Sequence, residues 1–198
     1  MTVKVLNGAK SPLGGAKHGN DDSVSLQEVP FTPGYDLRVD PASAGFAAVN
    51  AALGLTLPTT VGDVVRVNAP CPTDPEPGQN SVIAICLGPD WWYVTGTADV
   101  AALITPLRDE HHLSIVDVSA QRTKIEMWGP NSKAVLEHVW ENDLRESHFG
   151  IDKAAQGAMF HAPVILWHCC ENCYVIFVRA SFAEHLWAAL TDATVEYL

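Results

Sequence analysis

The sequence predicts an α+β fold in which antiparallel sheets are covered by helices. From residue 60 onward, segments with strand character and amphipathic helices follow one another in the order β-β-β-α-β-α-β-β-α. Strands that come in pairs favour antiparallel pairing, whereas a doubly wound parallel sheet needs a helix between successive strands. Hydrophobic residues make up 47% of the chain and charged residues 18%, which is enough apolar material for a packed core.

Residues 1–40 differ from the rest of the chain. They contain clusters of Gly, Pro, Asn and Asp without sustained periodicity, which is typical of an extended segment. The segment nevertheless carries large apolar side chains: Leu26, Val29, Phe31, Tyr35, Leu37 and Val39. We therefore expect an N-terminal arm over residues 1–40, laid over its own domain or over another chain, and one α+β domain over residues 41–198.

The first predicted helix spans residues 43–54. Ser43 is a suitable N-cap, and Gly54 stands where a left-handed helix stop is expected. A strand follows within residues 62–70. After a Pro-rich loop, residues 81–87 and 91–96 predict two strands joined by a tight turn.

Residues 97–110 predict a helix that Pro106 should kink or shorten. Residues 113–128 predict strand structure, and within them residues 123–128 alternate cleanly between two faces. A short helix is expected over residues 129–140, with a proline near its start.

The C-terminal part begins with a polar, irregular stretch. Residues 158–168 and 173–180 then predict two strands, and residues 181–190 a helix. Ser181 and Glu184 have the spacing of a capping box at the start of this helix.

Charge and composition limit the function classes. The formal net charge of −11 argues against sequence-independent nucleic-acid binding and against binding to an anionic membrane surface. The sequence holds no apolar run of about 18 residues and no signal-peptide core, so we expect a cytoplasmic protein. Five cysteines, an odd number and unevenly placed, fit reduced thiols in that compartment.

The segment HCCENC, residues 168–173, is the densest group of possible metal ligands. Neighbouring strand residues point to opposite faces, so Cys169 and Cys170 reach one tetrahedral zinc only if the backbone leaves the strand. A zinc site also needs a second ligand pair, and Cys71 and Cys86 both lack a partner at the required spacing. We predict no metal site.

A Cys170–Cys173 redox pair is the second interpretation of this segment, but it requires a strand-to-helix context and a strand follows here. We favour cysteine as a small apolar filler near a turn. The turn itself is either two residues, Glu171 and Asn172, or a four-residue loop around 169–172.

No other pattern marks a site. The sequence contains no HExxH, GxGxxG, GxxxxGK[ST] or GxSxG motif, so we predict no catalytic and no cofactor-binding residues. Asp117, Ser119 and Arg122 form the best polar group. Arg122 would hold a ligand carboxylate, or Asp117 and Ser119 hydrogen-bond the backbone where a strand breaks. We favour the second interpretation.

Adjacent Trp91 and Trp92 cannot share a strand face, so one either points outward as an interface anchor or lies under a helix.

Four segments together resemble the gamma subunit family of heterotetrameric sarcosine oxidase. They occur in the order QEVPFTPGYDLRVDP, LGPDWWYVTG, VDVSAQRTKIEMWGPNSKAVLEH and RASFAEHLWAAL, within residues 26–191. The resemblance implies the α+β fold of the glycine-cleavage T protein and its aminomethyltransferase relatives.

The resemblance also implies a role. Such a subunit is non-catalytic, holds no cofactor and packs on the alpha subunit, with beta and delta subunits in the same complex. FAD, FMN, NAD, tetrahydrofolate and zinc are expected on those other subunits. The complex oxidises sarcosine or a related N-methylated amino acid, makes hydrogen peroxide and passes the one-carbon unit to tetrahydrofolate. The alternatives are a stand-alone folate-binding aminomethyltransferase-like module and a thiol or metal module on residues 168–173.

Overall fold

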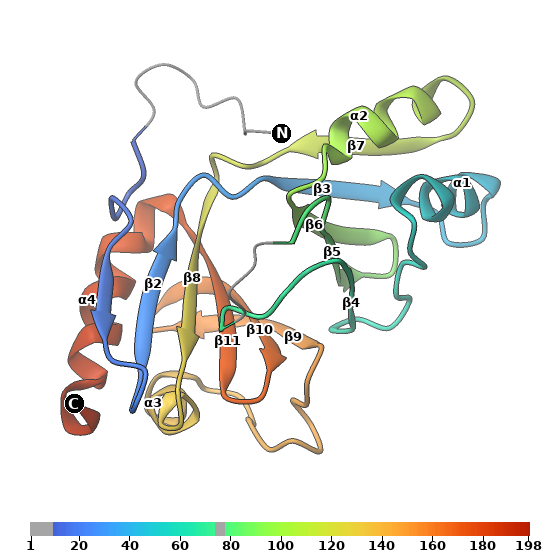
Figure 1. The fold of residues 1–198 in the computed structure, drawn as a ribbon. Helices are drawn as coiled ribbons and strands as arrows, with labels where there is room; N and C mark the ends of the chain where they lie inside the picture. The colour runs from blue at the N-terminus through green and yellow to red at the C-terminus, as the bar shows by residue number, and fades with distance from the viewer. Residues whose placement is uncertain (1–9, 74–77) are drawn as a thin grey trace. The chain divides into compact units, whose positions relative to one another are not determined.

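A computed structural model describes residues 10–73 and 78–198 (Figure 1). Its described part is mixed α+β, with two antiparallel sheets, which confirms the predicted fold class. The chain forms two compact units. Among the described residues, the first unit comprises 32–70 and 78–119, and the second comprises 10–31, 71–73 and 120–198.

The sheet of the first unit has the strand order β4-β5-β6-β3-β7. Its strands are β3 (Gly34–Val39), β4 (Val64–Val67), β5 (Val82–Gly88), β6 (Trp91–Gly96) and β7 (Leu113–Asp117). Helices α1 (Ala44–Leu53) and α2 (Val100–Ile104) pack on one face of this sheet. The core between them contains Leu37, Cys86, Trp92 and Val94 from the strands and Val49, Leu53 and Ile104 from the helices.

Local signals in this unit act as the sequence predicts. The Ser43 hydroxyl accepts a hydrogen bond from the Phe46 amide at 3.3 Å, which caps α1. Gly54 ends the helix in the left-handed region at φ 67°, where a side chain would be strained. Helix α2 stops at Ile104, and Pro106 lies in a following 3-10 turn, η1 (Thr105–Asp109), because proline cannot donate to an α-helical ladder.

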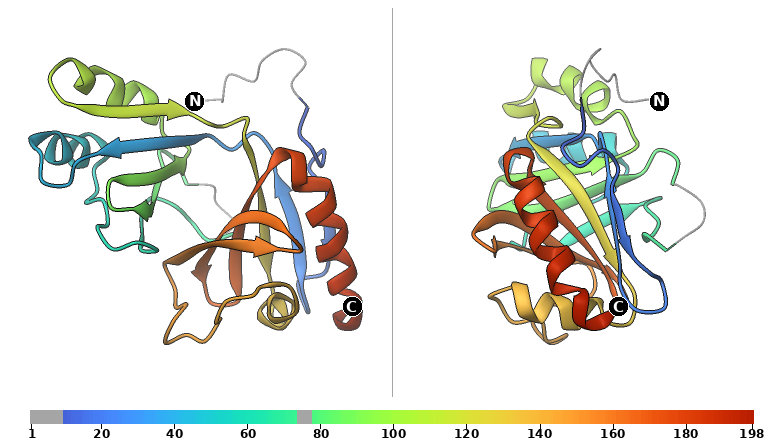
Figure 2. Two further views of the ribbon diagram at one scale, coloured as in Figure 1. Left: turned by 180° about the vertical axis from the view of Figure 1, so that it is seen from behind. Right: turned by 90° about the vertical axis from the view of Figure 1, so that its left-hand side faces the viewer.

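The sheet of the second unit has the order β1-β2-β8-β11-β10-β9. Its strands are β1 (Lys17–Gly19), β2 (Ser25–Val29), β8 (Arg122–Trp128), β9 (Lys153–Met159), β10 (Ala162–Cys170) and β11 (Cys173–Arg179). Helices α3 (Ser132–Val139) and α4 (Ala183–Ala193) pack on one face, and Figure 2 shows α4, in red, lying along the strands. Short 3-10 turns flank α4: η2 (Ala180–Phe182) and η3 (Val195–Tyr197).

The segment expected as an arm contributes strands to both sheets, and the boundary at residue 40 is not where the units divide. β2 pairs with β8 in the second unit, and β3 lies between β6 and β7 in the first. Leu26 and Leu37 are accordingly buried in the cores of these units. Within the range predicted as a single domain, 41–198, the described residues 41–70 and 78–119 lie in the first unit, and 71–73 and 120–198 lie in the second. Residues 1–9 of the expected arm lie outside the described residues.

Two local predictions near the C-terminus are wrong. The single strand expected over 158–168 is a hairpin, because Phe160 and His161 adopt left-handed backbone angles and turn the chain between β9 and β10. The Ser181 capping box is also absent: α4 begins after Phe182 without a side-chain cap, since η2 occupies the position of the expected first turn.

None of the helices in the described ranges has the length and apolar character that crossing a membrane requires.

Candidate functional site

An open hollow of about 400 Å³ lies beside the tip of the β10–β11 hairpin in the second unit. Asp21 and Trp128 form part of its wall, and the Trp128 indole N–H donates to Asp21 at 2.8 Å. The Ser25 hydroxyl donates to the same carboxylate at 2.7 Å. These two donors, Ser25 first, lower the pKa of Asp21. The second carboxylate of the wall is Glu171, and none of the described residues that line the hollow has a basic side chain. The described part of the wall therefore does not favour an anionic ligand.

The predicted cysteine group lies next to this hollow. A β-bulge occurs between His168 and Cys170, where the register of β10 against β11 shifts. Because a bulge reorients successive side chains, the Sγ atoms of Cys169 and Cys170 lie 4.0 Å apart instead of on opposite faces. The turn is the two-residue form, with Asn172 at φ 56°.

Cys71, which the sequence separates from this group, is brought to it by the fold. Its Sγ donates to the Cys169 carbonyl at 3.8 Å, and the Cys169 Sγ donates to the Cys173 carbonyl at 3.3 Å. None of the chain's cysteines forms a disulfide. Within residues 10–73 and 78–198, no group of three or more His, Cys, Asp or Glu side chains has the geometry of a metal site. The thiols form a hydrogen-bonded cluster.

His168 precedes the cluster but serves the core. It is buried and stacks on Tyr174 with ring centroids 4.6 Å apart. Its Nδ1 lies 3.0 Å from the Phe149 carbonyl, which can only accept, so this nitrogen carries the proton. His168 thus has one ring nitrogen committed to the backbone.

Asp117 and Ser119 bond locally, which is the arrangement that the sequence favoured. The Ser119 hydroxyl donates to Asp117 at 2.6 Å and accepts from the Gly34 amide at 3.0 Å. These bonds fix the end of β7 against β3 in the first unit. Burial, followed by the nearby Asp117 carboxylate, raises the pKa of Tyr35. Arg122 begins β8 in the second unit.

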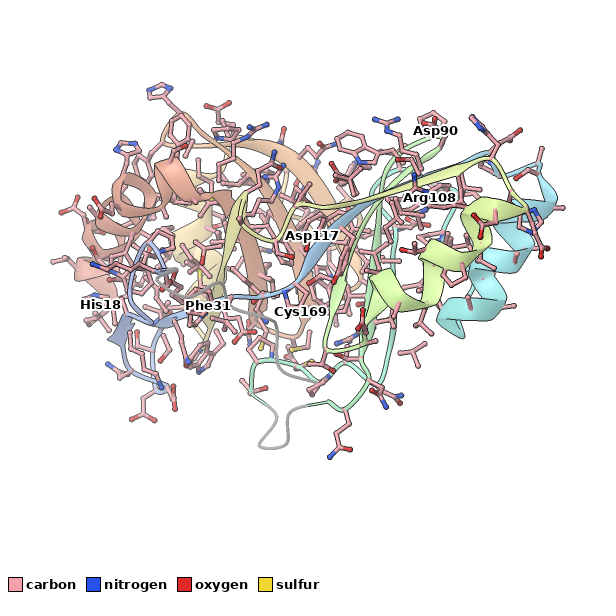
Figure 3. All side chains as sticks on the ribbon, turned by 90° about the horizontal axis from the view of Figure 1, so that it is seen from above. His18, Phe31, Asp90, Arg108, Asp117 and Cys169 are labelled. Carbon is pink, nitrogen blue, oxygen red and sulfur yellow. The ribbon has the colours of Figure 1, made fainter. Side chains whose placement is uncertain are left out.

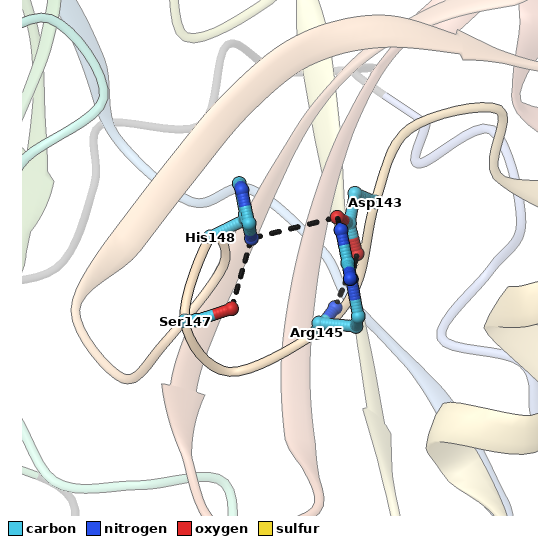
Figure 4. Close-up of polar contacts among 4 residues, drawn as sticks. All are labelled: Asp143, Arg145, Ser147 and His148. Atoms are coloured by element: carbon cyan, nitrogen blue, oxygen red, sulfur yellow. Dashed lines mark hydrogen bonds and ion pairs between the residues drawn. The ribbon is translucent and has the colours of Figure 1, made fainter.

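A second polar group, which sequence reasoning did not single out, lies in the loop before β9 (Figure 4). Arg145 binds Asp143 through its Nε at 2.8 Å and its guanidinium Nη2 at 2.5 Å. His148 Nδ1 lies 3.5 Å from Asp143 and 2.9 Å from the Ser147 hydroxyl. A Ser-His-Asp triad needs the serine and the aspartate on different ring nitrogens, and here both face Nδ1. The geometry therefore does not activate Ser147.

Trp91 and Trp92 point to opposite faces of β6, as the sequence predicts. Trp92 is buried beneath α1, where its indole N–H donates to the Pro58 carbonyl at 2.7 Å. Trp91 lies on the other face and is half-buried. The Arg38 guanidinium stands 4.9 Å from its ring centroid and reaches Asp90, labelled in Figure 3, at 3.2 Å.

Glu28 is the charged residue that sequence reasoning missed. Its side chain on β2 is completely buried. It accepts hydrogen bonds from the Gly15 amide at 2.7 Å, the Thr123 hydroxyl at 2.7 Å and the Leu13 amide at 3.4 Å. Through these three hydrogen bonds the buried carboxylate holds the loop before β1 on the sheet. Its role is therefore structural.

Comparisons with known proteins identify the same family over most of the chain. The sarcosine oxidase, gamma subunit family matches residues 38–196. The chain is 33% identical over 185 residues to a sarcosine oxidase subunit gamma from Corynebacterium sp. (strain U-96), covering 92% of this chain and 84% of the relative. It is 31% identical over 178 residues to the corresponding protein of Arthrobacter sp., covering 88% and 82%.

A comparison with solved structures also finds a sarcosine oxidase. The fold matches a chain of the heterotetrameric sarcosine oxidase from Corynebacterium sp. U-96, in complex with pyrrole 2-carboxylate, with a TM-score of 0.82 and 29% identity over 96% of both chains. It also matches the aminomethyltransferase T of the glycine cleavage system from Bartonella henselae, with a TM-score of 0.62 and 13% identity. That match covers 96% of this chain and 57% of the transferase, and it is a likeness of fold alone.

Proposed function

Because this chain belongs to the sarcosine oxidase gamma subunit family, we propose that it is the non-catalytic gamma subunit of a heterotetrameric sarcosine oxidase. The observation that carries the proposal is the match over 96% of both chains to a chain of such an enzyme. The assembled enzyme would oxidise sarcosine to glycine, release hydrogen peroxide and pass the one-carbon unit to tetrahydrofolate.

The polar groups of the chain support a non-catalytic role. Asp143 is bound by Arg145, Glu28 by three donors, and Asp117 by Ser119. A general base or nucleophile needs a proton-transfer partner facing a reacting atom. These carboxylates face their own loops and strands instead.

The hollow in the second unit supports the placement of cofactors on other subunits. FAD, FMN and NAD all carry phosphates, which proteins hold with basic side chains or with glycine-rich turns at helix N-termini. The hollow has Asp21 and Glu171 in its wall, and its lining residues within 10–73 and 78–198 include no basic side chain. Tetrahydrofolate carries carboxylates and is disfavoured there for the same reason.

Contact with the large alpha subunit would use exposed aromatic residues of the second unit. Phe160 is 39% exposed and Phe182 is 38% exposed. The two residues are close in the fold, because His185, three residues after Phe182, hydrogen-bonds the Phe160 carbonyl. Exposed aromatic side chains are favoured anchors of protein interfaces.

The test is reconstitution. The full chain is purified alone and also coexpressed with the remaining subunits from the same source, and sarcosine-dependent hydrogen peroxide formation is measured. We expect the lone chain to be colourless and inactive and the assembly to be active. Turnover of sarcosine by the lone chain, or tight flavin binding to it, would contradict the proposal.

The transferase-like alternative has a separate test. The full chain is titrated with tetrahydrofolate while the tryptophan fluorescence is followed, since Trp128 lines the hollow. We expect no saturable change. Saturable binding would favour a folate-binding module over a purely structural subunit.

A further inference from the structure

Four of the chain's five thiols meet at the tip of the β10–β11 hairpin. Figure 3 shows sulfur atoms grouped beside the labelled Cys169. The bulge brings Cys169 and Cys170 to a Sγ–Sγ distance of 4.0 Å. The Cys170 thiol also hydrogen-bonds with Cys173 and with Cys71, which follows β4 in the chain and belongs to the second unit. Segments about a hundred residues apart in the chain thus place their sulfur atoms together.

The members of this cluster differ in access to solvent. Cys169 and Cys173 are buried, whereas Cys71 and Cys170 are half-buried. An oxidant in solution therefore reaches Cys71 and Cys170 first. A bond between the adjacent Cys169 and Cys170 would also close a small strained ring, since a disulfide fixes the separation of its Cβ atoms near 3.8 Å.

We propose that Cys71 and Cys170 form a hydroperoxide-sensitive dithiol pair that closes into a disulfide. In the first step the Cys71 sulfur attacks the peroxide, the O–O bond breaks, and the products are a Cys71 sulfenic acid and water or an alcohol. In the second step the Cys170 sulfur attacks the Cys71 sulfur, which forms the S–S bond and releases water. The two thiols together lose two electrons and the peroxide gains them. A small dithiol reverses the reaction by exchange.

Hydrogen bonding with Cys169, the largest cause, raises the pKa of Cys170. The thiolate is the reactive form, so a raised pKa keeps Cys170 protonated and slows its own attack on the peroxide. It also makes the ring-closing step faster as the pH rises. The disulfide would covalently join the two segments that line the hollow, because Pro72 follows Cys71 and Glu171 follows Cys170.

The experiment uses the full chain, first reduced and desalted, then exposed to hydrogen peroxide, with free thiols alkylated before mass analysis. One disulfide lowers the mass by about 2 Da, the two hydrogens that the thiols lose. Trypsin places Cys71 on peptide 67–108 and Cys170 on peptide 154–179, so the proposed bond links two peptides. We expect this linked pair, in a yield that increases with pH and disappears with dithiothreitol.

Single substitutions assign the bond. Cys71→Ser and Cys170→Ser should each abolish the linked pair. Cys86→Ala is the matched control, because Cys86 shares peptide 67–108 but is buried inside β5 of the first unit. It should leave the yield unchanged. A bond confined to peptide 154–179, a linked pair that survives Cys71→Ser, or oxidation to sulfinic acid without any linked pair would overturn the proposal. Urea unfolding of each variant verifies that it is folded. This test is independent of the proposed subunit role.

Discussion

Nε2 of His185, on helix α4, lies 2.9 Å from the backbone oxygen of Phe160, at the turn between β9 and β10. The hydrogen bond joins a helix to a hairpin and fixes a turn with an unusual composition. Phe160 and His161 have φ angles of 46° and 67°. Two-residue hairpin turns with both φ values positive favour asparagine and glycine, so a bulky aromatic residue here is held at an energetic cost.

Phe160→Asn should therefore stabilise the chain while weakening assembly. Asparagine tolerates the left-handed region, and we expect the free energy of unfolding to increase by about 1 kcal/mol. Urea unfolding measures this gain, and copurification with the alpha subunit measures the loss of an exposed aromatic contact.

Phe182→Ala is the control for that variant, because asparagine at the N-cap position of α4 would itself favour the helix. Phe182 is exposed to a similar extent but has an ordinary φ of −106°. It should weaken copurification without any gain in stability. A lower urea midpoint for Phe160→Asn, or full copurification of both variants, would argue against this assignment.

Ser43→Ala should cost about 1 kcal/mol of stability, because the substitution removes the hydroxyl that caps α1. Ser181→Ala tests the cap that the sequence predicted wrongly. Ser181 lies in η2 and makes no capping bond to α4, so its substitution should change stability by less than about 0.5 kcal/mol. Equal urea midpoints for Ser43→Ala and the parent chain would show that the cap contributes nothing.

Glu28→Gln should destabilise the second unit by about 2 kcal/mol, because the charged acceptor of several hydrogen bonds is lost and an amide N–H₂ faces the remaining donors. Thr123→Val removes one of those donors and should cost less. Urea unfolding followed by tryptophan fluorescence compares the two variants. If Thr123→Val costs more than Glu28→Gln, the hydroxyl rather than the carboxylate dominates the network.

The Asp143–Arg145 pair predicts a defined acid dependence. Hydrogen bonds from the Arg145 side chain, and then from its backbone, lower the pKa of Asp143 from 3.8 to about 2. Because the pKa is lower in the folded state, the contribution of this pair to stability is complete above pH 3.8 and is lost as the pH falls through about 2.

Carboxyl NMR titration tests that dependence. In Arg145→Met the pKa of Asp143 should rise towards its ordinary value, although the backbone donor remains. Ser147→Ala is the control, since Ser147 contacts His148 and not Asp143. An Asp143 pKa near 3.8 in the parent chain would contradict the bonded geometry.

Local sequence signals correctly predicted the features that depend only on residues close together in the chain. The cap at Ser43, the stop at Gly54, the break at Pro106 and the alternation of β8 all follow from backbone geometry and short-range hydrogen bonding. The family was also recognisable from the order of a few segments, and the family match over residues 38–196 confirms it.

Long-range pairing decided the rest. β2 becomes a strand because β8, about a hundred residues later, offers its backbone groups, and nothing within residues 25–29 indicates that partner. The meeting of Cys71 with Cys170 has the same origin, together with a bulge that no sequence pattern marks. Sequence alone thus determined the cap and the stop of α1, the break at Pro106 and the alternation of β8. Only the tertiary structure decided which elements lie side by side, because that choice depends on hydrogen bonds and burial contributed by distant residues.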